Sequence, residues 1–306
     1  MILLQRLKTF AQQLTAALKL LQKNDPLRLA GATAFFANFA LPPIMLMLIQ
    51  LFGFFLGDSV IANRLFDRLE TLLGKNGSSQ IQQVLGNITA TKTQLWATIL
   101  SFIFFLFVAT TCFSIIKNSL DQIWKIRLND KPGMIMKLKV RLRSIIVILI
   151  AGILFLIGFI TDSIQGIIGT YLKHNAPSYG MQLLDILDEI GFIIIMTIWF
   201  SVLFRFLTNG RPSWLISFKG GLLTGILFTL GKHILRILLP MSNIGNIYGA
   251  SGSIILVMLF VFYSALIFYF GACFVKIISA DSHTQIRPIK GAFEYELKAV
   301  NKNPKN

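Results

Sequence analysis

The chain has 306 residues, of which 55% are hydrophobic and only 14% are charged. Soluble domains carry about 25% charged residues, so this composition excludes an ordinary soluble domain and favours an integral membrane protein. The formal net charge of +16 at pH 7 is compatible with a nucleic-acid partner, but the distribution of the basic residues along the chain argues against one.

Residues 2–23 are predicted to form an amphipathic helix. Its apolar positions recur every three or four residues, at Leu3, Leu7, Phe10, Leu14, Leu18 and Leu21. This period is that of an α-helix with one apolar face. Because other positions hold lysine and arginine, we expect the helix to lie in the cytoplasmic interface of the membrane rather than to cross it. The sequence Asn24-Asp25-Pro26 is expected to end it.

Six apolar blocks follow, and each is long enough to cross the hydrocarbon core of a bilayer. They lie at about 29–57, 94–116, 144–168, 189–208, 214–239 and 251–275. The predicted fold is therefore all-α, a polytopic membrane bundle of six transmembrane helices with the N-terminal interfacial helix and short external helices. Residues 1–278 are expected to form a single membrane domain, and residues 279–306 a cytoplasmic tail with a short helix around Phe293–Val300.

The first block has two features that concern its inner face. Pro42 and Pro43 lie near its middle, where proline removes a backbone donor and clashes with the preceding turn, so a kink or a break is expected. A broken helix lines the binding site in many transporters, but a simple packing kink is equally compatible with the sequence. Asn38 shares a helical face with Gly31 and Ala34, which predicts that it points inward.

The longest external segment, residues 58–93, is predicted to form two short amphipathic helices that cap the bundle. Apolar residues recur at helical spacing on both sides of Gly74-Lys75-Asn76-Gly77, which indicates a turn. The apolar positions are Ile61, Leu65, Leu69 and Leu72 before the turn, and Ile81, Val84, Leu85 and Ile88 after it.

The basic residues are distributed unevenly between the two sides of the predicted bundle. With both chain ends in the cytoplasm, most of the 29 lysine and arginine residues lie on the cytoplasmic side. The external segments contain only Arg64, Arg68, Lys75, Lys92 and Lys173. An excess of lysine and arginine in cytoplasmic loops orients membrane proteins, so the pattern predicts both termini inside. The basic loop 117–143 is interpreted in the same way, with added attraction to anionic lipid headgroups.

Charged and small residues share one helical face in two of the blocks. In the fifth block this face holds Gly221, Gly225, Thr229, Lys232 and Arg236. In the third block it holds Gly158, Asp162, Gly166 and Gly169. Small residues let a neighbouring helix approach closely, so both faces are predicted to point into the bundle, and Gly252 is expected to serve packing in the same way.

Ionised groups inside a membrane are costly, so they usually pair and often mark function. Asp162 and Lys232 lie at similar distances from the external ends of their blocks, which places them at similar depth. We therefore expect Asp162 to lie near Lys232 or Arg236, and exchanging the charges of Asp162 and Lys232 should rescue the single variants. The alternative is that the cations extend to the outer interface. His233 lies off this face and is interpreted as a packed or interfacial histidine.

The sequence lacks the motifs of common enzyme chemistry. His174, His233 and His283 lie far apart without metal-ligand spacing, and there is no phosphate-binding loop or serine elbow. Cys112 and Cys273 both fall inside apolar blocks, where buried thiols are expected rather than a disulfide. No enzymatic activity, metal ion or cofactor is therefore predicted.

One series of residues resembles a known family. The order Pro212–Trp214, Gly220-Gly221, Lys232, Tyr248–Ser253 and Gly271-Ala272 is similar to that of the YihY/BrkB family of bacterial inner-membrane proteins. The Tyr-Gly-x-x-Gly segment ahead of the last block is its most specific part. The resemblance implies a six-span protein of the bacterial inner membrane. Some members carry an old ribonuclease BN label, some are linked to virulence, and lipid or solute transport has been suggested for relatives.

Two functions fit these observations. The first is a transporter or flippase-like protein for an anionic or lipidic substrate, in which cations would pair with phosphate or carboxylate groups. Its candidate substrate-binding residues are Lys232, Arg236, Asp162 and Asn38. The second is a non-transporting membrane scaffold, or an envelope- or virulence-associated factor, in which the polar face only packs helices. Membrane lipids are the expected partners, nucleic acid is not, and oligomerisation is left open.

Overall fold

The chain folds mainly as long helices, with four short strands in the described part. The computed structural model describes residues 2–56, 59, 61–63, 65–67, 69–70, 78–79, 81–83, 85–86, 95–129, 150, 153, 157, 179–241, 252–282 and 284–296. The long helices are α1 (Ile2–Gln22), α2 (Pro26–Leu56), α4 (Leu95–Trp124), α6 (Tyr179–Phe206), α7 (Trp214–Met241) and α9 (Gly252–Asp281). Apolar sequences of this length form helices in a membrane because a helix satisfies its backbone donors and acceptors internally.

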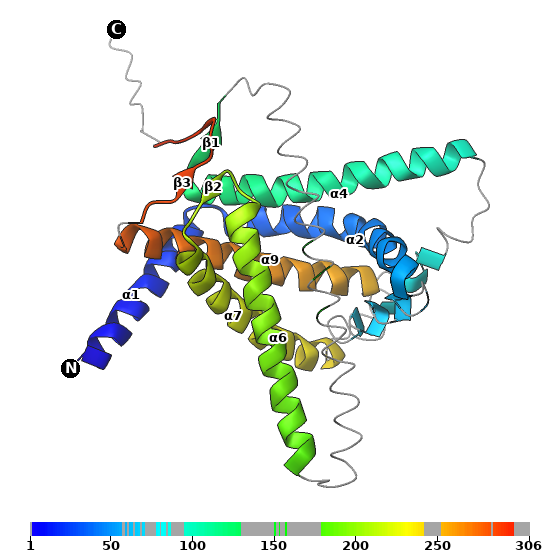
Figure 1. The fold of residues 1–306 in the computed structure, drawn as a ribbon, viewed down its shortest axis with the longest axis horizontal. Helices are drawn as coiled ribbons and strands as arrows, with labels where there is room; N and C mark the ends of the chain where they lie inside the picture. The colour runs from blue at the N-terminus through cyan, green and yellow to red at the C-terminus, as the bar shows by residue number, and fades with distance from the viewer. Residues whose placement is uncertain are drawn as a thin grey trace.

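Helix α9 occupies the middle of the arrangement (Figure 1). It packs against α1, α2, α4 and α7, and α2 also packs against α4. Helix α6 packs along α7 and reaches α9 through the stacked rings of Phe204 and Phe268, whose centroids are 5.1 Å apart. The contact with α7 is therefore the most extensive one that α6 makes in the described bundle.

Three helices contain apolar stretches long enough to cross a membrane, among the residues that the structure describes. These stretches are Glu189–Phe206 in α6, Trp214–Leu235 in α7 and Ile254–Asp281 in α9. Helices α2 and α4, with 31 and 30 residues, coincide with the first two predicted spans. The predicted span 144–168 lies outside the described residues apart from positions 150, 153 and 157, so the number of six stays a prediction.

The connection between the first two helices follows the sequence prediction. Helix α1 ends at Gln22, and α2 begins at Pro26, where the missing N–H is not needed for a helical hydrogen bond. Between them Asp25 adopts the left-handed conformation with φ of 51°, which aspartate tolerates better than most residues. The chain can therefore turn sharply from α1 into α2.

The proline pair bends helix α2 without breaking it. Pro42 and Pro43 both lie within α2, which is continuous over its whole length. Figure 1 shows the axis of α2 changing direction partway along, and proline is a common cause of such a bend. Asn38 and Pro42 are half-buried on this helix.

Short helical segments between residues 59 and 86 cover one end of α2 and α9. Their buried side chains form one apolar cluster with Met45 of α2 and Val257 of α9. The buried side chains are Ile61, Leu65, Ile81 and Leu85. All four belong to the predicted apolar faces, and in this position they cap the bundle. Leu72, Val84, Ile88 and the predicted turn at 74–77 lie outside the described residues.

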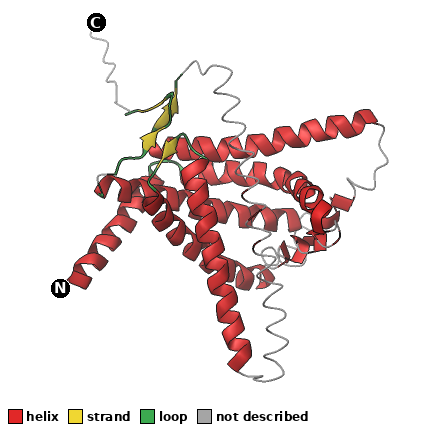
Figure 2. Ribbon diagram, viewed as in Figure 1, coloured by secondary structure: helices red, strands yellow, loops and turns green. Residues whose placement is uncertain are grey.

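The C-terminal segment folds back onto the opposite end of the bundle, where all four strands lie (Figure 2). Strand β4 (Ala292–Glu294) is antiparallel to β1 (Ile126–Leu128), which follows α4 directly. Strand β3 (Arg287–Pro288) is antiparallel to β2 (Gly210–Arg211), which lies in the connection between α6 and α7. The tail therefore joins two connections that are distant in the sequence.

Two predictions about this end are wrong. The helix expected around Phe293–Val300 does not begin there, because Phe293 pairs with Arg127 in a strand; residues 297–300 lie outside the described part. The basic loop expected from residue 117 begins as helix instead, because α4 continues to Trp124. The reason is that Asp121, near the end of α4, is hydrogen-bonded by Lys117 and Asn209 within the protein.

Among the described residues, the largest apolar core takes side chains from all six long helices and extends to the strands. The side chain of Trp124 is completely buried, and its Nε1–H donates a 2.9 Å hydrogen bond to the carbonyl oxygen of Ala272 on α9. Phe204 and Tyr269 are completely buried in the same core. Cys112 and Cys273 are buried free thiols, as the sequence predicts.

We expect Trp124→Phe to lower the free energy of unfolding by about 1–2 kcal/mol, because the phenyl ring lacks the indole donor and fills less of the core. The measurement is the midpoint of thermal unfolding of the purified protein in detergent. Trp214→Phe is the matched control, because Trp214 is 55% exposed and a substitution there is expected to change stability by about 0.5 kcal/mol or less. Equal midpoints for the two variants would contradict the prediction.

Candidate functional site

The face of α7 that the sequence predicts to point inward packs directly against α6. A Cβ atom added at Gly221 would clash with Ser201 Oγ and would lie 2.6 Å from the carbonyl oxygen of Thr197. A Cβ atom at Gly225 would lie 3.1 Å from Thr197 Oγ1 and 3.3 Å from its backbone nitrogen. The two glycines therefore let the backbones of α6 and α7 approach closely.

Lys232 lies further along the same face and meets two groups of α6. Its Nζ is 3.5 Å from Glu189 Oε2 and 4.0 Å from the centre of the Phe192 ring. Only 11% of the Lys232 side chain is exposed. A carboxylate and the negative face of an aromatic ring thus stabilise the ammonium group in place of most of its water.

Glu189 is shared between two basic side chains. Its Oε1 lies 3.1 Å from His233 Nε2, while its Oε2 faces Lys232. The sequence alone places Glu189 at the membrane boundary, because the fourth apolar block begins there. Helix α6 in fact begins at Tyr179, so Glu189 lies well inside the helix and projects toward α7. This partner of Lys232 was missed by sequence reasoning for that reason.

Two threonine hydroxyls in this contact have no hydrogen-bond partner among the described residues. Thr197 on α6 is 2% exposed, and Thr229 on α7, one turn before Lys232, is 5% exposed. Buried hydroxyls are nearly always hydrogen-bonded, so both can accept a further polar group such as water or an anion. We refer to Thr197, Thr229, Lys232 and Glu189 as the α6–α7 seam.

The structure does not bring all predicted site residues to this seam. Asp162, Gly158 and Gly166 lie outside the described residues, as does the side chain of Arg236 on α7. The pairing of Asp162 with Lys232 therefore stays a prediction. Gly252 is the first residue of α9. Asn38 lies on α2, which packs mainly against α4 and α9, and it is not among the described groups that contact Lys232.

A second buried polar cluster lies at the end of α4, near the strands. Lys117 Nζ is 3.0 Å from Asp121 Oδ2, and both residues are buried. Asn209, in the connection between α6 and α7, donates to Asp121 from its backbone N–H at 2.9 Å and from its side-chain amide at 2.6 Å. The sequence signal for this cluster is the spacing of Lys117 and Asp121, since residues four apart face each other on a helix.

This second cluster explains the length of α4. Asp121 accepts three hydrogen bonds, so its charge is compensated although it is buried. Lys276 of α9 adds a further link, because its Nζ bonds the carbonyl oxygen of Trp124 and Glu294 of β4. These contacts tie α4, α9, the α6–α7 connection and the tail together, and they give the cluster a structural role.

Metal-ligating side chains do not gather in the described part of the chain. No group of three or more histidine, cysteine, aspartate or glutamate residues there could hold a metal ion. His174 and His283 lie outside the described residues. What the described residues offer at the α6–α7 seam is charge pairing and hydrogen bonding.

Long apolar helices with ionised residues between them define this chain as a multi-pass helical membrane protein. Residues 17–292, nearly the whole chain, match the family described as Virulence factor BrkB. The chain therefore belongs to the BrkB (YihY/BrkB) family, as its motifs indicate. No curated protein matches the chain. No solved structure matches it either.

Proposed function

We propose that the protein is a transporter or flippase-like protein for an anionic or lipidic substrate in the bacterial inner membrane, with six spans and cytoplasmic termini. The observation that carries this proposal is the Lys232 ammonium group, whose side chain is only 11% exposed, beside Glu189 and Phe192. An ionised side chain inside a membrane span is costly and commonly marks a pathway. At 3.5 Å the contact with Glu189 is long for a hydrogen bond, so an incoming anion can compete for Lys232.

Neighbouring groups support the same role. The unpartnered hydroxyls of Thr197 and Thr229 can donate hydrogen bonds to a phosphate or carboxylate that pairs with Lys232. Arg236 extends the same helical face by one turn in sequence. Asp162 and Asn38 stay candidate substrate contacts on sequence grounds alone.

The test is transfer of lipid between leaflets by the full-length protein in vesicles. Vesicles containing fluorescently labelled phosphatidylglycerol report transfer through bleaching of the outer leaflet, with labelled phosphatidylcholine as the zwitterionic comparison. Lys232→Gln should slow the transfer of phosphatidylglycerol about tenfold to a hundredfold, because a hydrogen bond to a charged group contributes about 1.5–3 kcal/mol. Lys290→Gln, at an exposed position outside the helices, is the control and should match the unmodified protein.

Two results would reject the transport proposal. One is protein-containing vesicles that transfer no more labelled lipid than vesicles without protein. The other is a Lys232→Gln variant that transfers phosphatidylglycerol at the unmodified rate.

The scaffold alternative treats the α6–α7 seam only as a packing device, and the close approach at Gly221 and Gly225 favours it. Access of water separates the two interpretations. We expect a membrane-impermeant thiol reagent to label Thr229→Cys in a background without Cys112 and Cys273. Protection of Thr229→Cys to the extent seen for the buried core thiol of Cys273 in the unmodified protein would favour the scaffold.

A further inference from the structure

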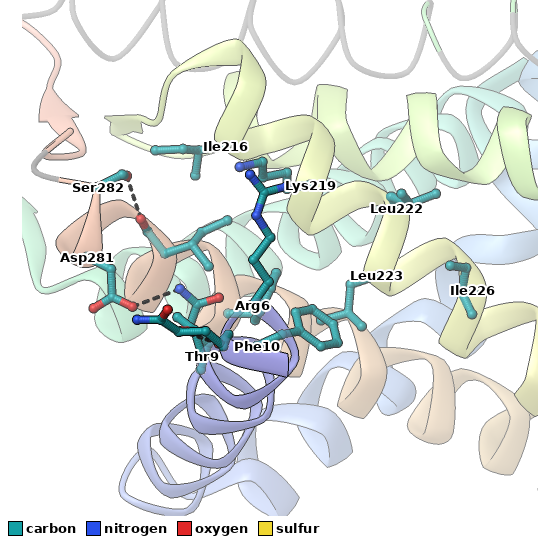
Figure 3. A pocket seen from close by; sticks show the side chains of 14 residues that line it. Arg6, Thr9, Phe10, Ile216, Lys219, Leu222, Leu223, Ile226, Asp281 and Ser282 are labelled. Carbon is teal, nitrogen blue, oxygen red and sulfur yellow. Dashed lines mark hydrogen bonds between the residues drawn. The ribbon is translucent and has the colours of Figure 1, made fainter. Parts of the chain in front are cut away.

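A cavity of about 940 Å³ lies between α1, the first half of α7 and the end of α9 (Figure 3). Its volume falls within the range of pockets that enclose small organic ligands. Most of its wall is apolar and includes Phe10 of α1, Leu222, Leu223 and Ile226 of α7, and Phe274 of α9. The cavity shares no residue with the α6–α7 seam.

Two cations from different helices line the same cavity. Arg6 comes from α1 and Lys219 from α7, and Figure 3 shows Arg6 extending from its helix toward Lys219. Neither pairs with a carboxylate in the described part of the chain. Asp281, the acidic residue of the lining, is instead hydrogen-bonded by Gln13 Nε2 at 2.9 Å. Like charges that face one cavity repel, and an anion bound between them would relieve the repulsion.

The apolar wall continues along a lipid-facing ridge of α7. Phe218, Leu222, Ile226, Leu230 and Ile234 recur at every fourth position, and each is at least 40% exposed. In a multi-pass membrane protein such an exposed apolar ridge contacts acyl chains. Leu222 and Ile226 belong both to the ridge and to the cavity, so the cavity is continuous with the lipid-facing surface.

Helix α1 places Arg6 at the level of lipid headgroups. Its exposed surface combines apolar side chains, Leu7 and Leu18, with the basic side chains of Arg6 and Lys8. A helix of this composition lies in the membrane interface, with its basic groups near the phosphates. An occupant of the cavity therefore meets cations at one end and apolar walls at the other.

We propose that this cavity binds an anionic phospholipid, with the phosphate between Arg6 and Lys219 and an acyl chain along Leu222 and Ile226. The inference is independent of transport, because it concerns a different set of residues and predicts stable binding.

The test measures lipid retained by the purified full-length protein by native mass spectrometry. The protein is equilibrated with phosphatidylglycerol or with phosphatidylcholine of identical acyl chains. We expect phosphatidylglycerol to be retained about 30-fold more strongly, because two basic groups at a membrane surface each favour an anionic lipid. The double variant R6Q/K219Q should lose this preference, and the double variant K23Q/K290Q, at exposed positions outside the cavity, should keep it.

A second variant tests the cavity without changing its charges. Leu223→Trp leaves both cations in place but fills the cavity, so it should also lower the retention of phosphatidylglycerol. Gel filtration shows whether each variant is folded. Unchanged retention in R6Q/K219Q, or equal retention of the two lipids by the unmodified protein, overturns the proposal. Displacement of bound phosphatidylglycerol by glycerol 3-phosphate, which has no acyl chains, would also overturn the proposal. The site would then recognise a soluble phosphate rather than a lipid.

Discussion

Replacement of Asp121 by alanine is expected to lower the free energy of unfolding by about 3–5 kcal/mol, because removing one partner of a buried ion pair leaves the other charge uncompensated. In the structure Asp121 is 6% exposed and lies 3.0 Å from Lys117, which is itself buried. The substitution also removes the acceptor of both hydrogen bonds from Asn209. The connection between α6 and α7 would then lose its anchor to α4.

The measurement is the thermal unfolding midpoint of Asp121→Ala in detergent, together with its yield as a single species on gel filtration. Two control variants test whether the uncompensated charge causes the destabilisation. The double variant K117M/D121L removes both charges and should be milder than Asp121→Ala, since no buried charge is left over. Arg28→Ala breaks an exposed ion pair with Asp25 and should cost about 1 kcal/mol or less. An Asp121→Ala protein as stable as Arg28→Ala would show that the buried pair does not hold this end together.

Substitution of Gly221 by alanine is expected to destabilise the contact between α6 and α7 by about 1–3 kcal/mol, the usual effect of overpacking. The added Cβ would lie 2.6 Å from the carbonyl oxygen of Thr197 and 2.9 Å from the backbone nitrogen of Ser201. Backbone atoms cannot rotate away as a flexible side chain does, so the two helices would have to separate.

Gly191→Ala on α6 is the matched control for this substitution. A Cβ atom at Gly191 would meet nothing within 4 Å. Since alanine is favoured over glycine inside a helix by about 1 kcal/mol, Gly191→Ala should leave the unfolding midpoint unchanged or raise it. The two substitutions are chemically identical, so opposite signs would locate the effect in the α6–α7 contact. A midpoint for Gly221→Ala at or above that of the unmodified protein would contradict this packing.

The helices were predictable because their signals are local. The apolar period of residues 2–23 and the breaker at Asn24-Asp25-Pro26 predict α1, which spans Ile2–Gln22. The last apolar block predicts α9, although the helix continues to Asp281 beyond the predicted end. The length and the period of an apolar block are properties of a short stretch of sequence, so they can be recognised without knowledge of the fold.

Contacts between distant segments were not predictable in the same way. The contact of Lys232 with Glu189 of α6 was not among the pairings that the sequence suggests. The suggested pairing with Asp162 stays a prediction, because Asp162 lies outside the described residues. Which carboxylate reaches a buried lysine depends on how two helices rotate against each other, and many rotations are compatible with one apolar pattern. The pairing of Phe293 with Arg127 is a similar case, since short strands acquire stability only from the bundle beneath them.

The amino-acid sequence alone indicates a helical membrane protein, the positions of most of its long helices, and a shared face of α7 for Gly221 and Lys232, since these properties follow from composition and helical period. The BrkB family follows from the motifs and from the match over residues 17–292. The three-dimensional packing shows in addition that this face meets α6, that Asp121 anchors the α6–α7 connection, and that Arg6 and Lys219 line one cavity. Each of these pairs residues far apart in the chain, and their meeting depends on the packing of whole helices.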